Sequence, residues 1–305
     1  MIAVAATIVA SLLVGVGAEW RFAGRAQHWA RNVLAATLYG LLPFVAFFNV
    51  ARLQVSVDLA AALALAVAVA AAAGALALLI ARRVLGVPRP VAGSVVVSAT
   101  QGNTGYLGLP VAFAVLGAGA LGKAIAYDAI LSLATLLLGG AAIGAALGER
   151  AGAGGRERMR AFVLRNPPLI AVVLGLLAPD ALAPQALVDA SHVVAVALAP
   201  LGFFALGAIL AGEAEEGVLG LPPPLTAPVG TAVVLKVLVT PLLLLAVAAP
   251  LVDLPRAFLL QAAMPSGING LLIAHAYGLD LRTSAASIAW STAIVLVATT
   301  VGAVL

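Results

Sequence analysis

The sequence predicts an all-α integral membrane protein with ten transmembrane helices, arranged as a 5+5 inverted repeat. Three observations lead to this fold class. Of the 305 residues, 64% are hydrophobic and 9% are charged, whereas about 25% of the residues of a soluble domain are charged. The apolar residues fall into ten long stretches. Two of these stretches, one in each half of the chain, contain helix-weakening glycine and proline beside polar residues.

The ten spans follow from the length that a bilayer requires, which is about 20 apolar residues. The first five cover residues 1–18, 33–50, 57–80, 91–117 and 120–147, and the last five cover residues 166–178, 188–211, 226–249, 256–278 and 283–304. We expect the first span to be a retained helix rather than a signal peptide, because it lacks a basic start. Residues 1–150 then form the first repeat, residues 151–165 a cytoplasmic linker, and residues 166–305 the second repeat.

The distribution of basic residues sets the expected topology. The connections after spans 1, 3, 5, 7 and 9 carry twelve Lys and Arg residues, and the other four carry three. Because cytoplasmic loops carry the excess of Lys and Arg, both termini are expected outside. The net charge of +4 is explained by this topology, and we expect no nucleic-acid partner.

Matched positions in the two halves suggest an internal duplication. Asn103 lies fifteen residues after Pro88, and Asn269 lies fourteen residues after Pro255. Each of the two prolines precedes an arginine at the start of a span. Five spans per half is an odd number, so the second half enters the membrane with the opposite orientation, which is an inverted repeat.

Spans 4 and 9 are expected to break inside the membrane. The first break lies in the stretch from Asn103 to Pro110, and the second in the stretch from Met264 to Gly270. Irregular backbone at membrane depth is tolerated only where protein buries it or water reaches it. Broken helices of this kind form the substrate sites of many secondary transporters.

Breaking a helix exposes backbone N–H groups and the positive end of the helix dipole. Two such ends that face one point form an anion site without an arginine. The side chains and glycines expected to contact a carboxylate are Asn103, Thr104, Gly105, Gly108, Ser266, Gly267 and Asn269. The alternative is that the polar side chains only satisfy the broken backbone.

Two charged side chains and two glutamines lie inside the spans near the breaks. Asp128 lies in span 5 and Lys236 in span 8. A charge at membrane depth is costly, so both should face protein or a cavity. One hypothesis pairs them, with Lys236 helping to hold the anion and Asp128 responding to protons; the alternative is a structural ion pair or a wet Asp128. Gln101 and Gln261 precede the two breaks and either line the cavity or bond neighbouring helices.

Other classes of function are less well supported by the sequence. The chain has no cysteine, and it shows no cluster of metal ligands and no phosphate-binding glycine loop. We therefore expect neither an enzyme nor a resident cofactor. A sodium- or proton-coupled symporter is the main alternative to an anion carrier, since side-chain oxygens at the breaks could also hold sodium. A channel or receptor is the third class.

The motifs at the breaks resemble those of the auxin efflux carrier family, which includes the plant PIN exporters and bacterial dicarboxylate permeases. Span 4 carries the N-T-x-x-x-G-x-P pattern. The matching residues are Asn103, Thr104, Gly108 and Pro110, then Arg165, Asn166 and Pro167, and finally Ala263, Met264, Pro265, Gly267, Ile268, Ala274 and Tyr277. Plant members often have proline where Gly270 stands and a long loop where this chain has its short linker.

The resemblance implies a carrier of organic anions in a bacterial cytoplasmic (inner) membrane. Its fold would be like that of NhaA and of bile-acid transporters, with spans 4 and 9 crossing at Pro110 and Pro265 beside the substrate. Spans 1, 2, 6 and 7 would form a scaffold that dimerises. Spans 3–5 and 8–10 would form a transport domain that moves like an elevator. Auxin-like carboxylates and dicarboxylates are the substrates that this family implies.

Overall fold

The computed structural model describes residues 2–22, 24–135, 143–148, 167–217 and 222–301. These residues form helices separated by short connections, and no strand longer than an isolated bridge occurs among them. In the first half the elements are α1 Ile2–Phe22, α2 Arg25–Ala36, η1 Thr37–Leu41, α3 Leu42–Val50, α4 Val57–Leu79, η2 Ile80–Val84, α5 Arg89–Thr100, η3 Thr104–Gly108, α6 Leu109–Leu116, η4 Ala118–Ala120, α7 Leu121–Thr135 and α8 Gly144–Leu147. The predicted linker, residues 151–165, lies outside the described residues.

The described elements of the second half are again α-helices and short helical turns. They are α10 Pro167–Leu177, η6 Asp180–Leu182, α11 Gln185–Glu215, α12 Ala227–Val234, η7 Leu235–Val239, α13 Thr240–Ala248, α14 Arg256–Ala262, α15 Ile268–Tyr277 and α16 Leu281–Val301. The described helices overlap the apolar stretches expected from the sequence, but α2 begins at Arg25, eight residues before the expected second span. Prolines set two of the starts, because Pro88 caps α5 and Pro255 caps α14.

Three spans contain a π-turn directly before a proline. The π-turns η1, η3 and η7 each end two residues before Pro43, Pro110 and Pro241, respectively. Proline cannot donate the backbone hydrogen bond that an α-helix needs at that position, and its ring crowds the preceding turn. A widened turn is one way to accommodate the proline without ending the helix. The prolines therefore distort these helices locally but leave them continuous.

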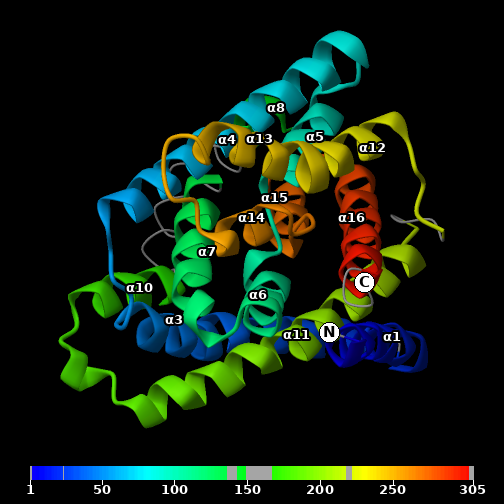
Figure 1. The fold of residues 1–305 in the computed structure, drawn as a ribbon. Helices are drawn as coiled ribbons and strands as arrows, with labels where there is room; N and C mark the ends of the chain where they lie inside the picture. The colour runs from blue at the N-terminus through cyan, green and yellow to red at the C-terminus, as the bar shows by residue number, and fades with distance from the viewer. Residues whose placement is uncertain (1, 23, 136–142, 149–166, 218–221, 302–305) are drawn as a thin grey trace.

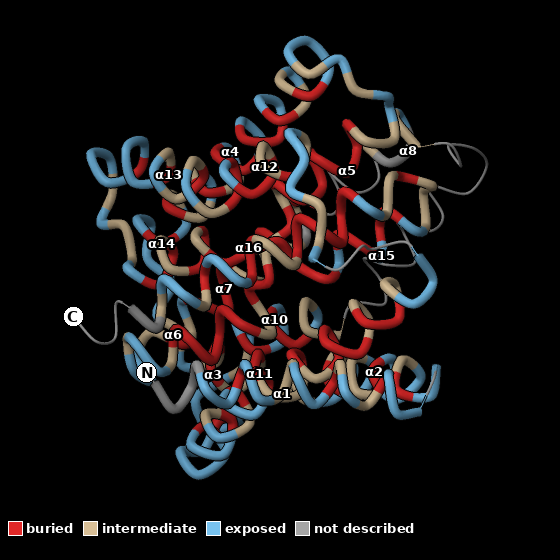
Figure 2. The backbone as a smooth tube through the Cα atoms, turned by 90° about the vertical axis from the view of Figure 1, so that its right-hand side faces the viewer, coloured by how far each residue is buried: buried red, intermediate tan, exposed pale blue. Residues whose placement is uncertain are grey.

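The helices form layers, as Figure 1 shows. Helices α1, α3 and α11 lie across the bottom of that view, and α4, α12 and α13 lie across the top. The elements between them include α6, α7, α14, α15 and α16. Figure 2 shows that buried residues are concentrated in these central elements, while the outermost turns are exposed. The two interrupted spans, α5–η3–α6 and α14–α15, therefore lie inside the protein.

Close helix contacts hold the lower layer together. Gly15 of α1 and Gly207 of α11 lie so near the opposite backbone, at Phe204 and Leu12 respectively, that a methyl group on either glycine would overlap a carbonyl oxygen. Helix pairs in membranes rely on small residues for this kind of contact. Helix α10 packs against α3 in the same way, since a methyl group on Gly175 would lie 2.9 Å from the carbonyl oxygen of Phe47.

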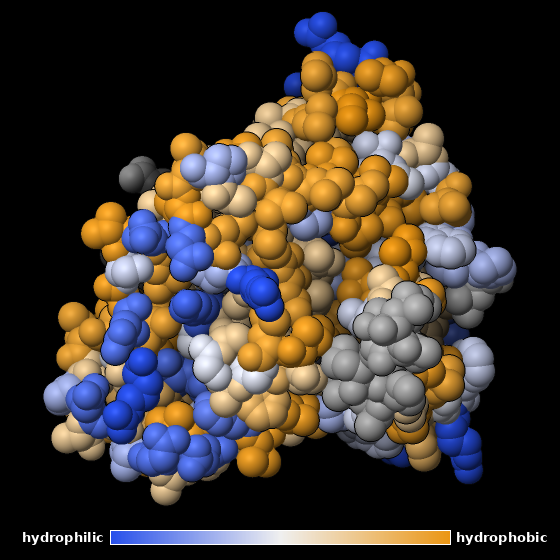
Figure 3. All heavy atoms as spheres, viewed as in Figure 1, coloured by the Kyte–Doolittle hydropathy of each residue, from blue (hydrophilic) through white to orange (hydrophobic). Residues whose placement is uncertain are grey.

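The outer surface matches a lipid environment. Figure 3 shows apolar residues over much of the face seen in Figure 1, with hydrophilic residues gathered at the lower left and at the upper tip. Five helical segments of the described residues are long and apolar enough to cross a membrane: Arg25–Val50, Val57–Val84, Gln185–Glu215, Ala227–Ala248 and Leu281–Thr299. The protein is therefore an all-helical, multi-pass membrane protein.

Candidate functional site

The two helix breaks meet inside the protein and bind each other through their backbones. An isolated antiparallel bridge joins Gly102 to Ser266. The backbone N–H of Asn103 donates to the carbonyl of Pro265 at 2.8 Å, and the N–H of Gly267 donates to the carbonyl of Gln101 at 3.0 Å. A break would otherwise leave these groups unsatisfied in an apolar medium. Each break therefore supplies the hydrogen bonds that the other has lost.

The crossing leaves no room for a side chain at its centre. A β-carbon on Gly267 would lie 2.7 Å from the carbonyl oxygen of Gly102. The backbone of Gly267 is extended, at φ −91° and ψ 155°, so glycine is needed here for space and not for its conformational freedom. The crossing falls at Gly102 rather than at Pro110, and the expectation drawn from the resemblance is wrong on this point. Pro110 is buried inside α6, whereas Pro265 does lie at the crossing.

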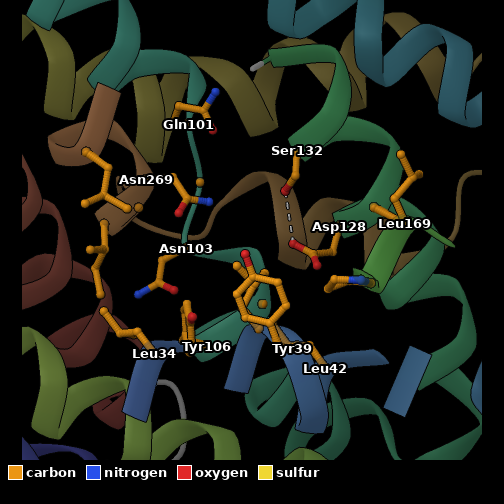
Figure 4. Close-up of a pocket in the computed structure, with 18 of the residues that line it drawn as sticks. Leu34, Tyr39, Leu42, Gln101, Asn103, Tyr106, Asp128, Ser132, Leu169 and Asn269 are labelled. Atoms are coloured by element: carbon orange, nitrogen blue, oxygen red, sulfur yellow. Dashed lines mark hydrogen bonds between the residues drawn. The ribbon is translucent and has the colours of Figure 1, made fainter. Parts of the chain in front are cut away.

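A cavity of about 250 Å³ lies beside the crossing. Its lining comes from both breaks, from α7, and from α2, η1, α3 and α10 on the opposite side. The lining residues are Leu34, Ala35, Leu38, Tyr39, Leu42, Gln101, Gly102, Asn103, Gly105, Tyr106, Asp128, Ala129, Ser132, Pro168, Leu169, Gly267, Ile268, Asn269 and Leu272. No Lys, Arg or His occurs among these described residues. Figure 4 shows the polar side chains that face this space.

Both half-helices that follow the breaks open onto the cavity at their N-terminal ends. The helix of Thr104–Leu116 contributes Gly105 and Tyr106, and α15 contributes Ile268 and Asn269. The first N–H groups of a helix have no partner within that helix, and the helix dipole adds partial positive charge there. The cavity wall is thus electropositive at two places without a basic side chain.

Two buried amides on the wall lack partners. Gln101 is 2% exposed and Asn103 is 4% exposed. Neither Nε2 of Gln101 nor Oδ1 of Asn103 has a hydrogen-bond partner in the described structure. An unsatisfied buried polar group costs about 1–3 kcal/mol, and such groups in native proteins call for an explanation. Of the two atoms, Nε2 of Gln101 is a donor and Oδ1 of Asn103 is an acceptor.

Asp128 of α7 faces the cavity from the other side (Figure 4). Its Oδ1 accepts hydrogen bonds from the hydroxyl of Thr104 and, at 3.3 Å, from that of Ser132. Asp128 and Ser132 are four residues apart and so project from the same face of the helix. Thr104 is the first residue after the break, so this bond ties α7 to the start of the half-helix.

Lys236 occupies the other side of the crossing. It is 3% exposed, and its Nζ donates to the carbonyl of Ala262, the last residue of α14, at 2.8 Å. A β-carbon on Gly102 would lie 3.4 Å from the same Nζ. Lys236 does not line the cavity, and no ion pair joins it to Asp128 in the part of the chain that the structure describes. The hypothesis that these two residues pair is therefore wrong for this structure.

Several other predicted residues lie behind the cavity wall. The Ser266 hydroxyl donates to the carbonyl of Ser98 at 2.7 Å, which supports the alternative that it only satisfies the backbone. Gln261 donates to the carbonyl of Ala124 at 3.0 Å and packs so tightly on Gly108 that a methyl group there would overlap it. Thr104 is buried beside the cavity rather than in its lining. Among the predicted residues, the structure thus brings Gln101, Asn103, Gly105, Asp128, Gly267 and Asn269 together at the cavity.

Sequence reasoning missed the wall formed by the second span. Leu34, Tyr39 and Leu42 lie far from both breaks in the sequence but face them across the cavity (Figure 4). They are ordinary apolar residues of a transmembrane helix, so no local signal could single them out. Ser132 could have been found, since its spacing from Asp128 places both on one helix face.

A multi-pass helical protein with paired helix breaks around a polar cavity has the features of a membrane transporter. Comparison with known proteins agrees. The family model described as "Membrane transport protein" matches residues 162–302. An uncharacterized transporter from Methanocaldococcus jannaschii is 27% identical over 227 residues, covering 70% of this chain and 68% of that protein. These matches agree with the resemblance found in the sequence, and they indicate a membrane transporter rather than an enzyme.

Proposed function

We propose that the protein carries organic anions across the membrane by alternating access. The observation that carries this proposal is the cavity wall, where two half-helix N-termini converge with the side-chain amides of Gln101, Asn103 and Asn269. Dipole ends and amide groups suit a carboxylate, and none of the described lining residues adds a fixed positive charge. Asn103, Gly105, Gly267 and Asn269 are the proposed contacts, with Gln101 beside them. We expect Thr104, Gly108, Pro265 and Ser266 to support this wall from behind.

The shape of the cavity favours an anion with one charged end and an apolar body. The polar groups Gln101, Asn103 and Asn269 gather on one side (Figure 4). The second span contributes leucines and Tyr39 to the remaining wall. A second carboxylate on a dicarboxylate would have to lie against this apolar wall or near Asp128, where burial of a charge is costly. A monocarboxylate with an apolar or aromatic body fits better.

The packing of the helices supports a division into two moving parts. Helices α1, α3, α10 and α11 contact one another, and the interrupted spans pack with α4, α7, α12, α13 and α16. The cavity lies where these two groups meet. We propose that the first group is a scaffold, that it forms a homodimer, and that the second group moves against it as an elevator. The 5+5 inverted repeat, both termini outside and a bacterial inner membrane belong to the same proposal.

Counterflow in proteoliposomes tests the proposal. We expect labelled phenylacetate or indole-3-acetate to exchange and malate to exchange more slowly. Asn103→Ala should reduce exchange roughly tenfold or more, because one lost hydrogen bond to a charged group is worth about 1.5–3 kcal/mol. Asn49→Ala is the matched control: Asn49 is also buried, but it bonds Ser191 at 2.8 Å within the scaffold. If only cations or neutral solutes exchange, or if both variants lose exchange equally, the proposal is wrong.

One observation favours cation coupling as a second candidate. The unpartnered Oδ1 of Asn103 is an acceptor, and Asp128 adds a carboxylate to the same cavity. Amide and carboxylate oxygens accept hydrogen bonds, and they also bind sodium. Repeating the counterflow with choline in place of sodium separates the two, because a sodium-coupled carrier would slow down markedly.

A further inference from the structure

Asp128 brings a carboxyl group into a cavity proposed to hold an anion. Among the described residues that line this cavity it is the only carboxyl group, and none of the others is basic. A sphere of the cavity's volume is roughly 8 Å across. An anion anywhere inside therefore lies within about one Debye length of Asp128, in surroundings that screen charge less than water does.

Among the described residues no charged group bonds this carboxylate. Its hydrogen-bond partners there are the hydroxyls of Thr104 and Ser132, which are uncharged. The ionisable side chains on the described elements around it are Tyr106 of η3, Tyr39 of η1, Asp58 of α4, Arg256 of α14, Lys123 and Tyr127 of α7, and Lys236 of η7. Tyr127 packs against Phe258. Asp58, Lys123 and Arg256 are exposed at helix starts, and Lys236 bonds the end of α14 instead.

We propose that Asp128 is a proton-binding site that couples the entry of one proton to the entry of one organic anion. This inference rests on the proposed function. With Asp128 ionised, the cavity repels an anion; with a proton on its carboxyl group, the two half-helix ends attract one. By linkage, a bound anion raises the affinity of Asp128 for a proton to the same extent. Proton and monoanion then cross together, and the loaded carrier bears no added charge.

The hydrogen bonds of Asp128 involve one of its two oxygens. Thr104 and Ser132 both donate their hydroxyls to Oδ1, and no described side chain donates to Oδ2. Among the described residues no group of three or more His, Cys, Asp or Glu is placed to hold a metal ion.

The link to Thr104 gives the proton a structural effect. Thr104 begins the half-helix that follows the first break, and Asp128 belongs to the neighbouring helix α7. Protonation of the carboxyl group changes the strength of this bond, since bonds to an ionised acceptor are roughly twice as strong as neutral ones. The proton therefore acts on the same element that carries the proposed anion contacts.

The test uses the full-length protein in proteoliposomes that contain the pH dye pyranine. Adding phenylacetate outside should acidify the lumen at a rate that follows uptake of labelled phenylacetate. An inward proton gradient should raise the accumulation of the anion at least tenfold over its absence. An imposed sodium gradient should have no effect. The first two results hold for the wild-type chain, so they do not depend on a variant that folds.

Asp128→Asn keeps the shape of the protonated carboxyl group but cannot bind a proton. We expect this variant to exchange phenylacetate in counterflow with little dependence on pH, and to lose accumulation driven by the proton gradient. Asn49→Ala is the control: Asn49 bonds Ser191 in the proposed scaffold and does not line the cavity, so this variant should keep gradient-driven accumulation. Passive uptake by protonated phenylacetate is subtracted with protein-free liposomes.

Three results would overturn the coupling. The first is wild-type counterflow without gradient-driven accumulation or luminal acidification. The second is an Asp128→Asn variant that still accumulates the anion with the proton gradient, and the third is accumulation driven by sodium. If the wild-type protein exchanges no carboxylate at any pH, the proposed function itself is wrong. This result differs from a failure of the coupling alone, in which counterflow is still seen.

Discussion

The sharpest prediction concerns the point where the two breaks touch. Gly267→Ala adds one methyl group, which would lie 2.7 Å from the carbonyl oxygen of Gly102, 2.9 Å from its carbonyl carbon and 3.2 Å from the backbone nitrogen of Asn103. These are backbone atoms, so no side chain can turn away. Because the extended backbone at Gly267 is one that alanine adopts readily, the effect is purely steric.

The cost can be worked from the bonds that must yield. To make room, the breaks must separate, which weakens two hydrogen bonds, from Asn103 to Pro265 and from Gly267 to Gln101. Each is worth about 1 kcal/mol, and overpacking adds about 1–3 kcal/mol. We therefore expect Gly267→Ala to lower the free energy of unfolding by about 3–5 kcal/mol and to abolish exchange.

Gly270→Ala is the matched control, three residues further along α15. A methyl group there would meet Val97 at 3.5 Å, an ordinary van der Waals contact, and alanine is the better helix former. Thermal unfolding in detergent and counterflow in proteoliposomes are measured for both variants. Equal stability and equal exchange for the two would refute the view that backbone contact at the crossing determines the site.

Three further predictions follow from the contacts around the site. Lys236→Met should lower the free energy of unfolding by about 1.5–3 kcal/mol, while the folded variant keeps the counterflow KM of the wild-type protein. The reason is that the ammonium bonds the end of α14 and does not line the cavity. A raised KM would place this lysine in the binding site. Asn269→Ala should raise the KM severalfold, whereas Ser266→Ala should mainly cost about 1 kcal/mol of stability, since only the first lines the cavity; matching KM changes would contradict this. Gly15→Ala should lower the thermal midpoint of unfolding through overlap with α11, whereas Gly17→Ala, with open space around it, should not; midpoints that stay together would argue against close α1–α11 packing.

The sequence predicted the features that have a strong local signal. Proline and glycine beside Asn103 and before Asn269 marked two breaks, and the structure has both of them. Apolar stretches of span length predicted the helices, because few alternatives satisfy the backbone in lipid. The residue at which the spans cross was not predicted. No sequence motif marks Gly102 as the contact point. The break was expected to cross at Pro110, but the widened turn η3 accommodates this proline inside a continuous helix.

Features that depend on packing between distant segments could not be predicted. Glu19 directly follows the first expected span, yet it is 1% exposed, and its carboxylate accepts the backbone N–H groups of Gly24 and Gln27 at 2.7 and 3.0 Å. One of the two hypotheses for Lys236 and Asp128 paired them because both are charged at membrane depth. Each has a different partner in the fold, and hydrogen bonds to a helix end or to hydroxyls leave no sequence pattern.

The position of Lys236 shows how the proposed site would attract an anion without a basic residue of its own. Each break has a positive end where a half-helix begins and a negative end where one stops, of roughly half an elementary charge each. Without another charge nearby, the fields of the positive and negative helix ends would largely cancel each other at a crossing. The Lys236 ammonium binds the last carbonyl of α14 and lies against Gly102, so it offsets the negative ends on its own side. The positive ends then face the cavity uncompensated.

In the proposed cycle an ionised Asp128 opposes the field of these helix ends and a protonated Asp128 does not, so the same site can both bind and release its cargo. A fixed arginine would hold a carboxylate more tightly through paired hydrogen bonds and would slow its release.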